Sequence, residues 1–154
     1  GIPCLSYPEM LGVVSKDKFT IAISGSHGKT TTTAMLGKIL IDAKYDPSIV
    51  VGSLLKDSKS NFVAGNSEYF VVEACEFKKS FLNINPKIIV ITNIDNDHLD
   101  YYKTFANIKK AFVTEYPNWN NTANPPAVKV EDEASFKAIS AKMLDPLWQA
   151  YPTP

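Results

Sequence analysis

Residues 19–33 read FTIAISGSHGKTTTT and place an apolar run, a glycine loop and a threonine-rich segment in direct succession. The run Phe19–Ser24 is short and rich in apolar and β-branched side chains, which is typical of a buried strand. Thr30–Ala43 has the apolar spacing of a helix. The side chains expected to face inward from it are Ala34, Met35, Ile39 and Leu40. The order is therefore strand, loop, helix.

The rest of the chain continues this alternation. Further strands are expected at Ile49–Val51, Phe62–Val63, Tyr69–Ala74 and Lys87–Thr92, and a helix at Thr104–Thr114 with Phe105, Ile108, Ala111 and Phe112 inward. The longer strands are continuously apolar rather than alternating, which indicates strands covered on both faces, as in parallel sheets. We therefore predict an α/β fold with a mostly parallel, doubly wound, P-loop-type sheet.

Composition argues against several classes of function. Sixteen basic and sixteen acidic residues cancel, so the chain lacks the basic excess of proteins that bind nucleic acid or anionic membranes. No apolar run reaches the ~20 residues of a membrane span. Two cysteines, Cys4 and Cys75, do not make a disulfide framework. We expect a cytoplasmic protein that binds neither nucleic acid nor membrane, with Cys75 as a buried structural thiol.

The segment Gly25-Ser26-His27-Gly28-Lys29-Thr30 has the features of a phosphate loop. A helix N-terminus has unpaired N–H groups and a partial positive charge, and glycines let the backbone approach phosphate oxygens. In such a loop Lys29 contacts the β- and γ-phosphates and the Thr30 hydroxyl ligates Mg²⁺. The match is imperfect, because Ile23 stands where the general pattern has its first glycine. An ordinary glycine turn before a helix is the alternative.

Four threonines open the helix, although threonine is a weak helix former. Hydroxyl groups in a first turn can satisfy spare donors or bind metal and phosphate. We expect this role of Thr30 and Thr31, and packing roles of Thr32 and Thr33. His27 has two open interpretations, which are contact with phosphate and packing.

Acidic residues and a histidine follow two other predicted strands. Glu73 lies at the end of Tyr69–Ala74, and the loop after Lys87–Thr92 contains Asp95, Asp97, His98 and Asp100. Carboxyl ends of parallel strands are where α/β folds bind ligands. A carboxylate and an imidazole there are candidates to hold Mg²⁺, although hard cations prefer oxygen ligands. The alternative is a solvated acidic loop. We expect Glu76 and the lysines that follow it to form a solvated face.

Three stretches resemble the Mur ligase family. In chain order they are Gly25–Leu36, Glu73–Glu76 with Ser80–Leu82, and Thr92–Tyr102. Within the family, His27 favours the branch that adds L-alanine to UDP-N-acetylmuramate or its muropeptide-recycling relative. The Ser-Phe-Leu run and the Tyr-Tyr ending favour the L-alanine branch. Related alternatives are the muropeptide-recycling relative and ligases like folylpolyglutamate synthase. The resemblance covers about residues 1–113.

The resemblance implies an ATP-dependent carbon–nitrogen ligase of peptidoglycan precursor synthesis. In that reaction ATP phosphorylates a carboxylate, and an amino group attacks the acyl phosphate, so catalysis rests on positioning and charge neutralisation. It implies that Lys29 stabilises the transferring phosphoryl group. It further implies that Thr30 and Glu73 ligate one Mg²⁺ and His98 a second. The nucleotide-binding residues it implies are Gly25, Ser26, His27, Gly28, Lys29, Thr30 and Thr31.

The family has a front domain for the UDP-sugar, a central ATPase and a rear domain for the amino acid. The resemblance implies that residues 1–18 are a lead-in segment or interdomain linker. The residues themselves predict a helical turn at Pro8–Leu11 that ends at Gly12. Residues 19–116 are then part of the ATP-binding central domain. Residues 117–154 stay unassigned, with a helix expected at Glu131–Met143 and the N- and C-terminal domains missing.

Two readings compete with a ligase. The first is a truncated domain that binds nucleotide or a partner without turnover. The second is another P-loop protein, such as a kinase or GTPase, against which the pairing of Glu73 with His98 argues.

Overall fold

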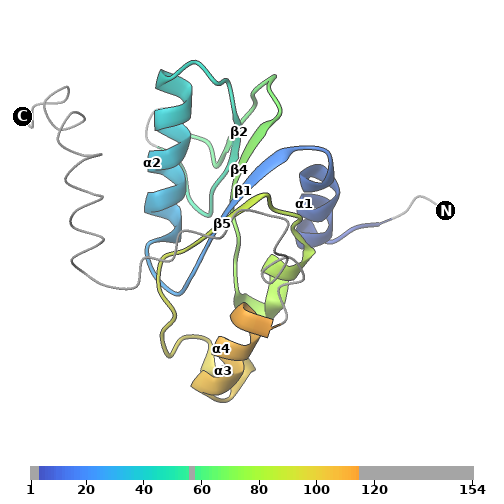
Figure 1. Cartoon of the computed structure of the whole chain (residues 1–154), viewed down its shortest axis with the longest axis vertical. Helices are drawn as coiled ribbons and strands as arrows, with labels where there is room; N and C mark the ends of the chain where they lie inside the picture. The colour runs from blue at the N-terminus through green and yellow to red at the C-terminus, as the bar shows by residue number, and fades with distance from the viewer. Residues whose placement is uncertain (1–3, 56–57, 115–154) are drawn as a thin grey trace, which may run out of the picture.

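The computed structural model describes residues 4–55 and 58–114. Its elements (Figure 1) are α1 (Tyr7–Lys16), β1 (Phe19–Ser24), α2 (Lys29–Asp42), β2 (Ser48–Val50), β3 (Phe62–Val63), β4 (Tyr69–Glu73), the 3-10 helix η1 (Phe77–Asn83), β5 (Ile88–Ile91), α3 (Leu99–Tyr102) and α4 (Phe105–Thr114). Within these ranges, no helix is long and apolar enough to cross a membrane. The helix expected at Glu131–Met143 lies outside the described residues.

The five strands form one open sheet in the order β3-β2-β4-β1-β5. β1 pairs in parallel with β4 and with β5, and β2 pairs in parallel with β4, whereas β3 is antiparallel to β2. The register sets Ile23 opposite Glu73 and Ser24 opposite Ile91. The carboxyl ends of β1, β4 and β5 therefore meet at one edge. This confirms the predicted, mostly parallel α/β sheet.

Both faces of the sheet are covered, as a doubly wound fold requires. Along β1, Ile21 and Ile23 belong to one hydrophobic core, and Ala22 between them belongs to the other. The first core includes partly buried side chains of α2, which contacts β1, β2 and β4. The second includes residues of η1, α3 and α4. Figure 1 shows α2 on one side of the sheet and α1 on the other.

The inward face of α2 differs from the prediction. Thr33 and Gly37 are buried, but Met35 is 42% exposed, so the expectation that Met35 faces inward is wrong. A Cβ built on Gly37 would lie 2.6 Å from Ile49 Cδ1. The helix therefore packs closest to the sheet at a glycine, which an apolar count does not register. In α4, Ile108, Ala111 and Phe112 are buried as expected, whereas Phe105 is 43% exposed.

The first helix is also longer than predicted. It runs through Gly12 to Lys16 instead of ending at Gly12. The carboxylate of Glu9 accepts the Ser6 backbone N–H at 2.7 Å and so caps its start. Gly12 is buried, and a Cβ there would lie 2.6 Å from the Asn83 carbonyl oxygen. This glycine allows α1 to pack against η1 rather than ending the helix.

Candidate functional site

The loop of residues 25–28 joins the carboxyl end of β1 to the first residue of α2. Gly25 has φ 122° and Gly28, the N-cap of α2, has φ 82°. Glycine adopts such angles with little strain. A Cβ on Gly25 would also lie 2.3 Å from Thr92 Oγ1. The loop therefore needs both of its glycines, one of them because it passes directly against the end of β5.

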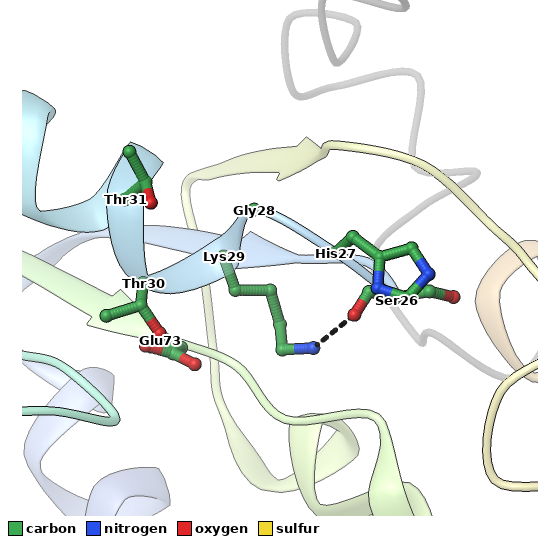
Figure 2. Close-up of a pocket in the computed structure, with 7 residues that line it drawn as sticks. All are labelled: Ser26, His27, Gly28, Lys29, Thr30, Thr31 and Glu73. Atoms are coloured by element: carbon green, nitrogen blue, oxygen red, sulfur yellow. Dashed lines mark hydrogen bonds between the residues drawn. The ribbon is translucent and has the colours of Figure 1, made fainter.

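A pocket of about 370 Å³ opens over this loop. Its lining (Figure 2) consists of Ser26, His27, Gly28, Lys29, Thr30, Thr31 and Glu73. These are the predicted nucleotide-binding residues except Gly25, together with the predicted metal ligand from β4. The start of α2 adds backbone N–H groups that lack partners within the helix. The pocket thus combines donors suited to an anion with oxygens suited to a cation.

The Lys29 side chain turns back beneath the loop. Its Nζ donates hydrogen bonds to the carbonyl oxygens of Gly25 (2.6 Å) and Ser26 (3.1 Å). It also donates to Glu76 Oε1 at 3.1 Å. The Lys29 side chain is 14% exposed and that of Glu76 1%. The expectation that Glu76 belongs to a solvated face is therefore wrong, because its carboxylate is buried against the loop lysine.

Thr30 and Glu73 meet across the edge of the sheet. Thr30 Oγ1 donates a hydrogen bond of 2.9 Å to Glu73 Oε2. The backbone N–H of Gly52 donates to the same oxygen at 2.7 Å, and Oε1 takes part in neither bond. The two expected ligands of one Mg²⁺ thus lie together, on the loop side of β4.

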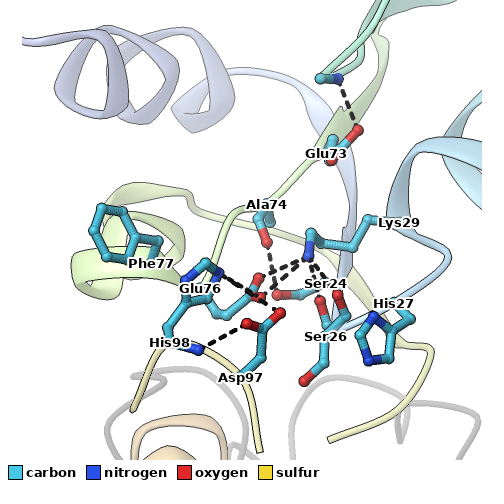
Figure 3. Close-up of polar contacts among 12 residues, drawn as sticks. Ser24, Ser26, His27, Lys29, Glu73, Ala74, Glu76, Phe77, Asp97 and His98 are labelled. Atoms are coloured by element: carbon cyan, nitrogen blue, oxygen red, sulfur yellow. Dashed lines mark hydrogen bonds and ion pairs between the residues drawn. The ribbon is translucent and has the colours of Figure 1, made fainter. Parts of the chain in front are cut away.

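His98 lies in a second group. It is the N-cap of α3 with φ 52°, and its carbonyl oxygen accepts the backbone N–H groups of Tyr101 and Tyr102. Its Nε2 is 3.4 Å from Glu76 Oε1 and 3.9 Å from Asp97 Oδ2, and its ring packs on Phe77 with 4.9 Å between centroids. Ligand atoms of Glu76, Asp97 and His98 lie within 4.8 Å of one another. Figure 3 shows this group converging, with Glu73 apart from it.

The segment after β5 holds the phosphate loop in shape. Asn93 Oδ1 accepts the His27 backbone N–H and Asn93 Nδ2 donates to the His27 carbonyl oxygen, both at 3.0 Å. Ser26 is tied to the same segment, because its N–H donates to the Asn93 carbonyl and its Oγ accepts the Asp95 N–H. Sequence reasoning missed Asn93. The available signal was a polar residue directly after the strand that neighbours β1.

The His27 ring is not packed in the core. Its side chain is 67% exposed and lines the pocket, and its Nε2 is 3.7 Å from Asp95 Oδ2. Of the two interpretations of this residue, packing is excluded by that exposure. The main chain of His27 is fixed by Asn93, whereas its exposed imidazole lines the pocket beside Asp95.

Two further groups feel the charges of the site. Burial raises the pKa of the Tyr7 hydroxyl, and the Glu73 carboxylate raises it further. Cys75 is exposed as a residue, which corrects the expectation of a buried thiol. Partial burial of its sulfur nevertheless raises the pKa of the Cys75 thiol, and the Glu76 carboxylate raises it further. The Phe77 backbone N–H has a lowering effect on this pKa that is smaller than the effect of burial. A thiol held protonated in this way is a poor nucleophile.

Residues 23–140 match the model of the Mur ligase middle domain. The chain belongs to the Mur ligase family. It is 54% identical over 113 residues to UDP-N-acetylmuramate--L-alanine ligase of Caldicellulosiruptor saccharolyticus, and 48% identical over 114 residues to that of Borreliella burgdorferi. Each match covers 73% of this chain, but 25% and 24% of the relative. The chain thus spans about a quarter of the length of these curated relatives.

Solved Mur ligases share this fold. The UDP-N-acetylmuramate-alanine ligase of Thermotoga maritima is 30% identical with a TM-score of 0.60, over 69% of this chain and 24% of that one. The UDP-N-acetylmuramate:L-alanyl-gamma-D-glutamyl-meso-diaminopimelate ligase from Neisseria meningitides is 23% identical with a TM-score of 0.67, over 92% and 48%. The second likeness shows the fold alone. The middle-domain match extends to residue 140. The boundaries predicted from the sequence, after residues 18 and 116, stay predictions.

Proposed function

We propose that this chain supplies the ATP-phosphate and Mg²⁺ site of a ligase that joins L-alanine to UDP-N-acetylmuramate. The observation that carries the proposal is the convergence of Lys29, Thr30 and Glu73 at a pocket over the N-terminus of α2. A lysine and helix N–H groups suit a polyphosphate. A hydroxyl and a carboxylate oxygen suit a hard cation. These donors, gathered in one pocket, support the proposal of a combined metal and nucleotide site.

The residues fit Mg²⁺ by the chemistry of their donors. Thr30 and Glu73 would hold one ion, and His98 would hold a second beside the oxygens of Glu76 and Asp97. Mg²⁺ supplies charge neutralisation and polarisation of phosphoryl oxygens. Lys29 adds a further positive charge for the phosphoryl group in transfer, and the loop backbone orients the phosphates. The chain's own contribution is thus positioning and electrostatics.

The remaining parts of the reaction are proposed to lie outside this chain. It spans about a quarter of its relatives, so contacts to UDP-N-acetylmuramate and L-alanine belong to N- and C-terminal domains. We place the whole enzyme in the bacterial cytoplasm. The alanine-adding branch is supported by relatives 54% and 48% identical that carry that name. The likeness to the diaminopimelate-containing peptide ligase is weaker in sequence, at 23%.

Calorimetric titration of the chain with ATP tests the proposal. We expect binding that depends on Mg²⁺, and a loss of about tenfold or more in affinity, or ~1.4 kcal/mol, in both Lys29→Ala and His98→Ala. Lys16→Ala is the matched control, because Lys16 precedes β1 at the opposite edge of the sheet. Circular dichroism shows that each variant is folded. The proposal is contradicted if the folded chain does not bind ATP, or if Lys29→Ala binds ATP as tightly as the wild type.

Turnover separates the ligase from a domain that only binds nucleotide. In a protein of the relatives' full length, phosphate release that requires both L-alanine and UDP-N-acetylmuramate supports the ligase. Nucleotide binding without such release supports the non-enzymatic alternative.

A further inference from the structure

We propose that Glu76 is a positioning residue that couples Lys29 of the phosphate loop to His98 of the loop after β5. The inference deepens the proposed function and rests on it for its catalytic meaning. The claim that the Glu76 carboxylate positions both side chains rests only on contacts within the chain. It assigns a task to a buried acid that neither the phosphate loop nor the Thr30–Glu73 pair explains.

Glu76 contacts both partners with the same carboxylate. Its Oε1 accepts the hydrogen bond of Lys29 Nζ at 3.1 Å and lies 3.4 Å from His98 Nε2. Its Oε2 lies 3.0 Å from Lys29 Nζ without accepting a hydrogen bond from any described residue. The three residues follow β4, β1 and β5 respectively. One side chain therefore joins the ends of the three adjacent strands that form the site (Figure 3).

The carboxylate is held in place by its own main chain. The Glu76 carbonyl oxygen accepts hydrogen bonds from the Tyr102 hydroxyl and from the Lys79 backbone N–H. Two residues earlier, directly after β4, the Ala74 carbonyl oxygen accepts a hydrogen bond from the Ser24 hydroxyl at 2.7 Å, which ties the end of β4 to β1. A backbone anchored from these sides keeps the carboxylate under the loop. The main chain of Glu76 is therefore anchored by contacts that involve neither Lys29 nor His98.

Burial makes this arrangement costly unless it is compensated. A carboxylate that is 1% exposed loses its hydration and needs a partner of opposite charge. Lys29 provides that partner and is thereby drawn beneath the loop, where it also bonds two loop carbonyls. Glu76 thus determines where the lysine rests before a nucleotide is bound. Any displacement of Lys29 is felt at Oε1, and hence at the His98 imidazole.

The inference predicts a relay that can be observed by nitrogen NMR on the chain without any nucleotide. In the wild type, Lys29→Ala should shift the His98 imidazole resonances, because Oε1 loses its lysine donor. In the Glu76→Gln background, Lys29→Ala should leave them unchanged. Glu76→Gln by itself should move both the His98 and the Lys29 side-chain resonances. Glu68→Gln, an exposed acid preceding β4 at the opposite edge, should move neither.

A second variant guards against a loss of folding. Glu76→Asp keeps the charge but withdraws the carboxylate by one methylene group, and we expect the His98 resonances to move in the same direction as in Glu76→Gln. A merely structural Glu76 would alter the melting temperature but would not relay Lys29→Ala to His98. His98 resonances that respond equally to Lys29→Ala with and without Glu76 overturn the inference.

Binding of ATP with Mg²⁺ links the relay to the site. The tenfold loss expected from His98→Ala should shrink to less than about threefold, or ~0.7 kcal/mol, when Glu76 is already glutamine. Full additivity of the two substitutions contradicts the coupling. A folded chain that binds no ATP contradicts the proposed function instead, while the NMR relay still decides the role of Glu76.

Discussion

Thr30 Oγ1 donates a 2.9 Å hydrogen bond to Glu73 Oε2, and so joins the first turn of α2 to the last residue of β4. The two residues are 43 positions apart in sequence. They meet because β1 and β4 pair in parallel, with Ile23 opposite Glu73. A hydroxyl and a carboxylate that already lie together are oxygens of the kind that a hard cation prefers, as the proposed Mg²⁺ site requires.

The charge of Glu73 should matter more than its shape. Glu73→Gln retains an oxygen that can accept from Thr30 and Gly52 but removes the negative charge that attracts Mg²⁺. We expect ATP affinity without Mg²⁺ to be unchanged or higher. We expect the gain in affinity on adding Mg²⁺ to fall about tenfold, or ~1.4 kcal/mol. Calorimetry with and without Mg²⁺ measures both, and Thr30→Ser, which keeps the hydroxyl, is the control. A full Mg²⁺ effect in Glu73→Gln would remove it from the metal site.

A methyl group at Gly52 should disturb the site while sparing the fold. A Cβ there would lie 2.8 Å from Glu73 Oε1 and 3.0 Å from Oε2. Those atoms end a flexible side chain, so Gly52→Ala should change the free energy of unfolding by only about 0.5 kcal/mol. The displaced carboxylate should lose its bond to Thr30 and with it the Mg²⁺ dependence of ATP binding. Urea denaturation and calorimetry test the two halves, and Ser53→Ala is the exposed neighbour for comparison. If ATP binding to Gly52→Ala depends on Mg²⁺ as it does in the wild type, the position of the Glu73 carboxylate does not control the metal site.

The contact between α2 and the sheet should show a specific rescue. Gly37→Ala adds a Cβ 2.6 Å from Ile49 Cδ1, and overpacking of this kind costs about 1–3 kcal/mol, offset by about 1 kcal/mol of helix propensity. Ile49→Val removes Cδ1 and alone costs about 0.5–1.5 kcal/mol. The double variant should be more stable than the sum of the single effects predicts, by at least ~0.5 kcal/mol. Urea unfolding measures the stability of the three variants. Simple additivity of the two substitutions would show that Gly37→Ala does not clash with Ile49 Cδ1.

The turn before β2 should contribute to stability in a pH-dependent way. The Asp46 carboxylate accepts hydrogen bonds from the backbone N–H and side-chain amide of Asn66, and these hold the pKa of Asp46 below its usual 3.8. A lowered pKa in the folded state means that the contribution is complete above about 3.8 and is lost as the pH falls through the folded value. Asp46→Asn tolerates the left-handed backbone at this position (φ 47°) but removes the charge.

The stability difference between wild type and Asp46→Asn should therefore be constant near neutral pH and should shrink below pH ~3.8. Urea unfolding at several pH values measures this difference. A difference that grows on acidification would have the wrong sign for a lowered pKa, and Lys59→Ala, in the β2–β3 loop, provides a comparison without a carboxylate.

Sequence reasoning failed at several helix faces and glycines, each for an identifiable physical reason. The sequence predicts a helix end at Gly12, but this residue lies inside α1, where the carbonyl oxygen of Asn83 leaves no room for a side chain. The apolar spacing predicts Met35 in the core, but α2 approaches the sheet along Thr33 and Gly37. The short helices η1 and α3 carry too few residues for a periodic signal. For Gly12 and Gly37 the decisive contact, with Asn83 and Ile49 respectively, comes from outside the helix.

The sequence by itself determined the strand, glycine loop and helix of residues 19–42 and the family to which they belong, because apolar runs and glycines act locally. It also determined that the acidic and histidine motifs follow strands. Only the tertiary structure decided which side chain meets Lys29. Glu76 is followed by Phe77 and two lysines, a charged pattern that predicts a solvated face. However, the parallel register of β4 with β1 carries Glu76 under the loop, and the chain then enters η1, which is kinked where Lys78 and Lys79 adopt left-handed angles. Its burial is a consequence of strand pairing, which residue type alone does not encode.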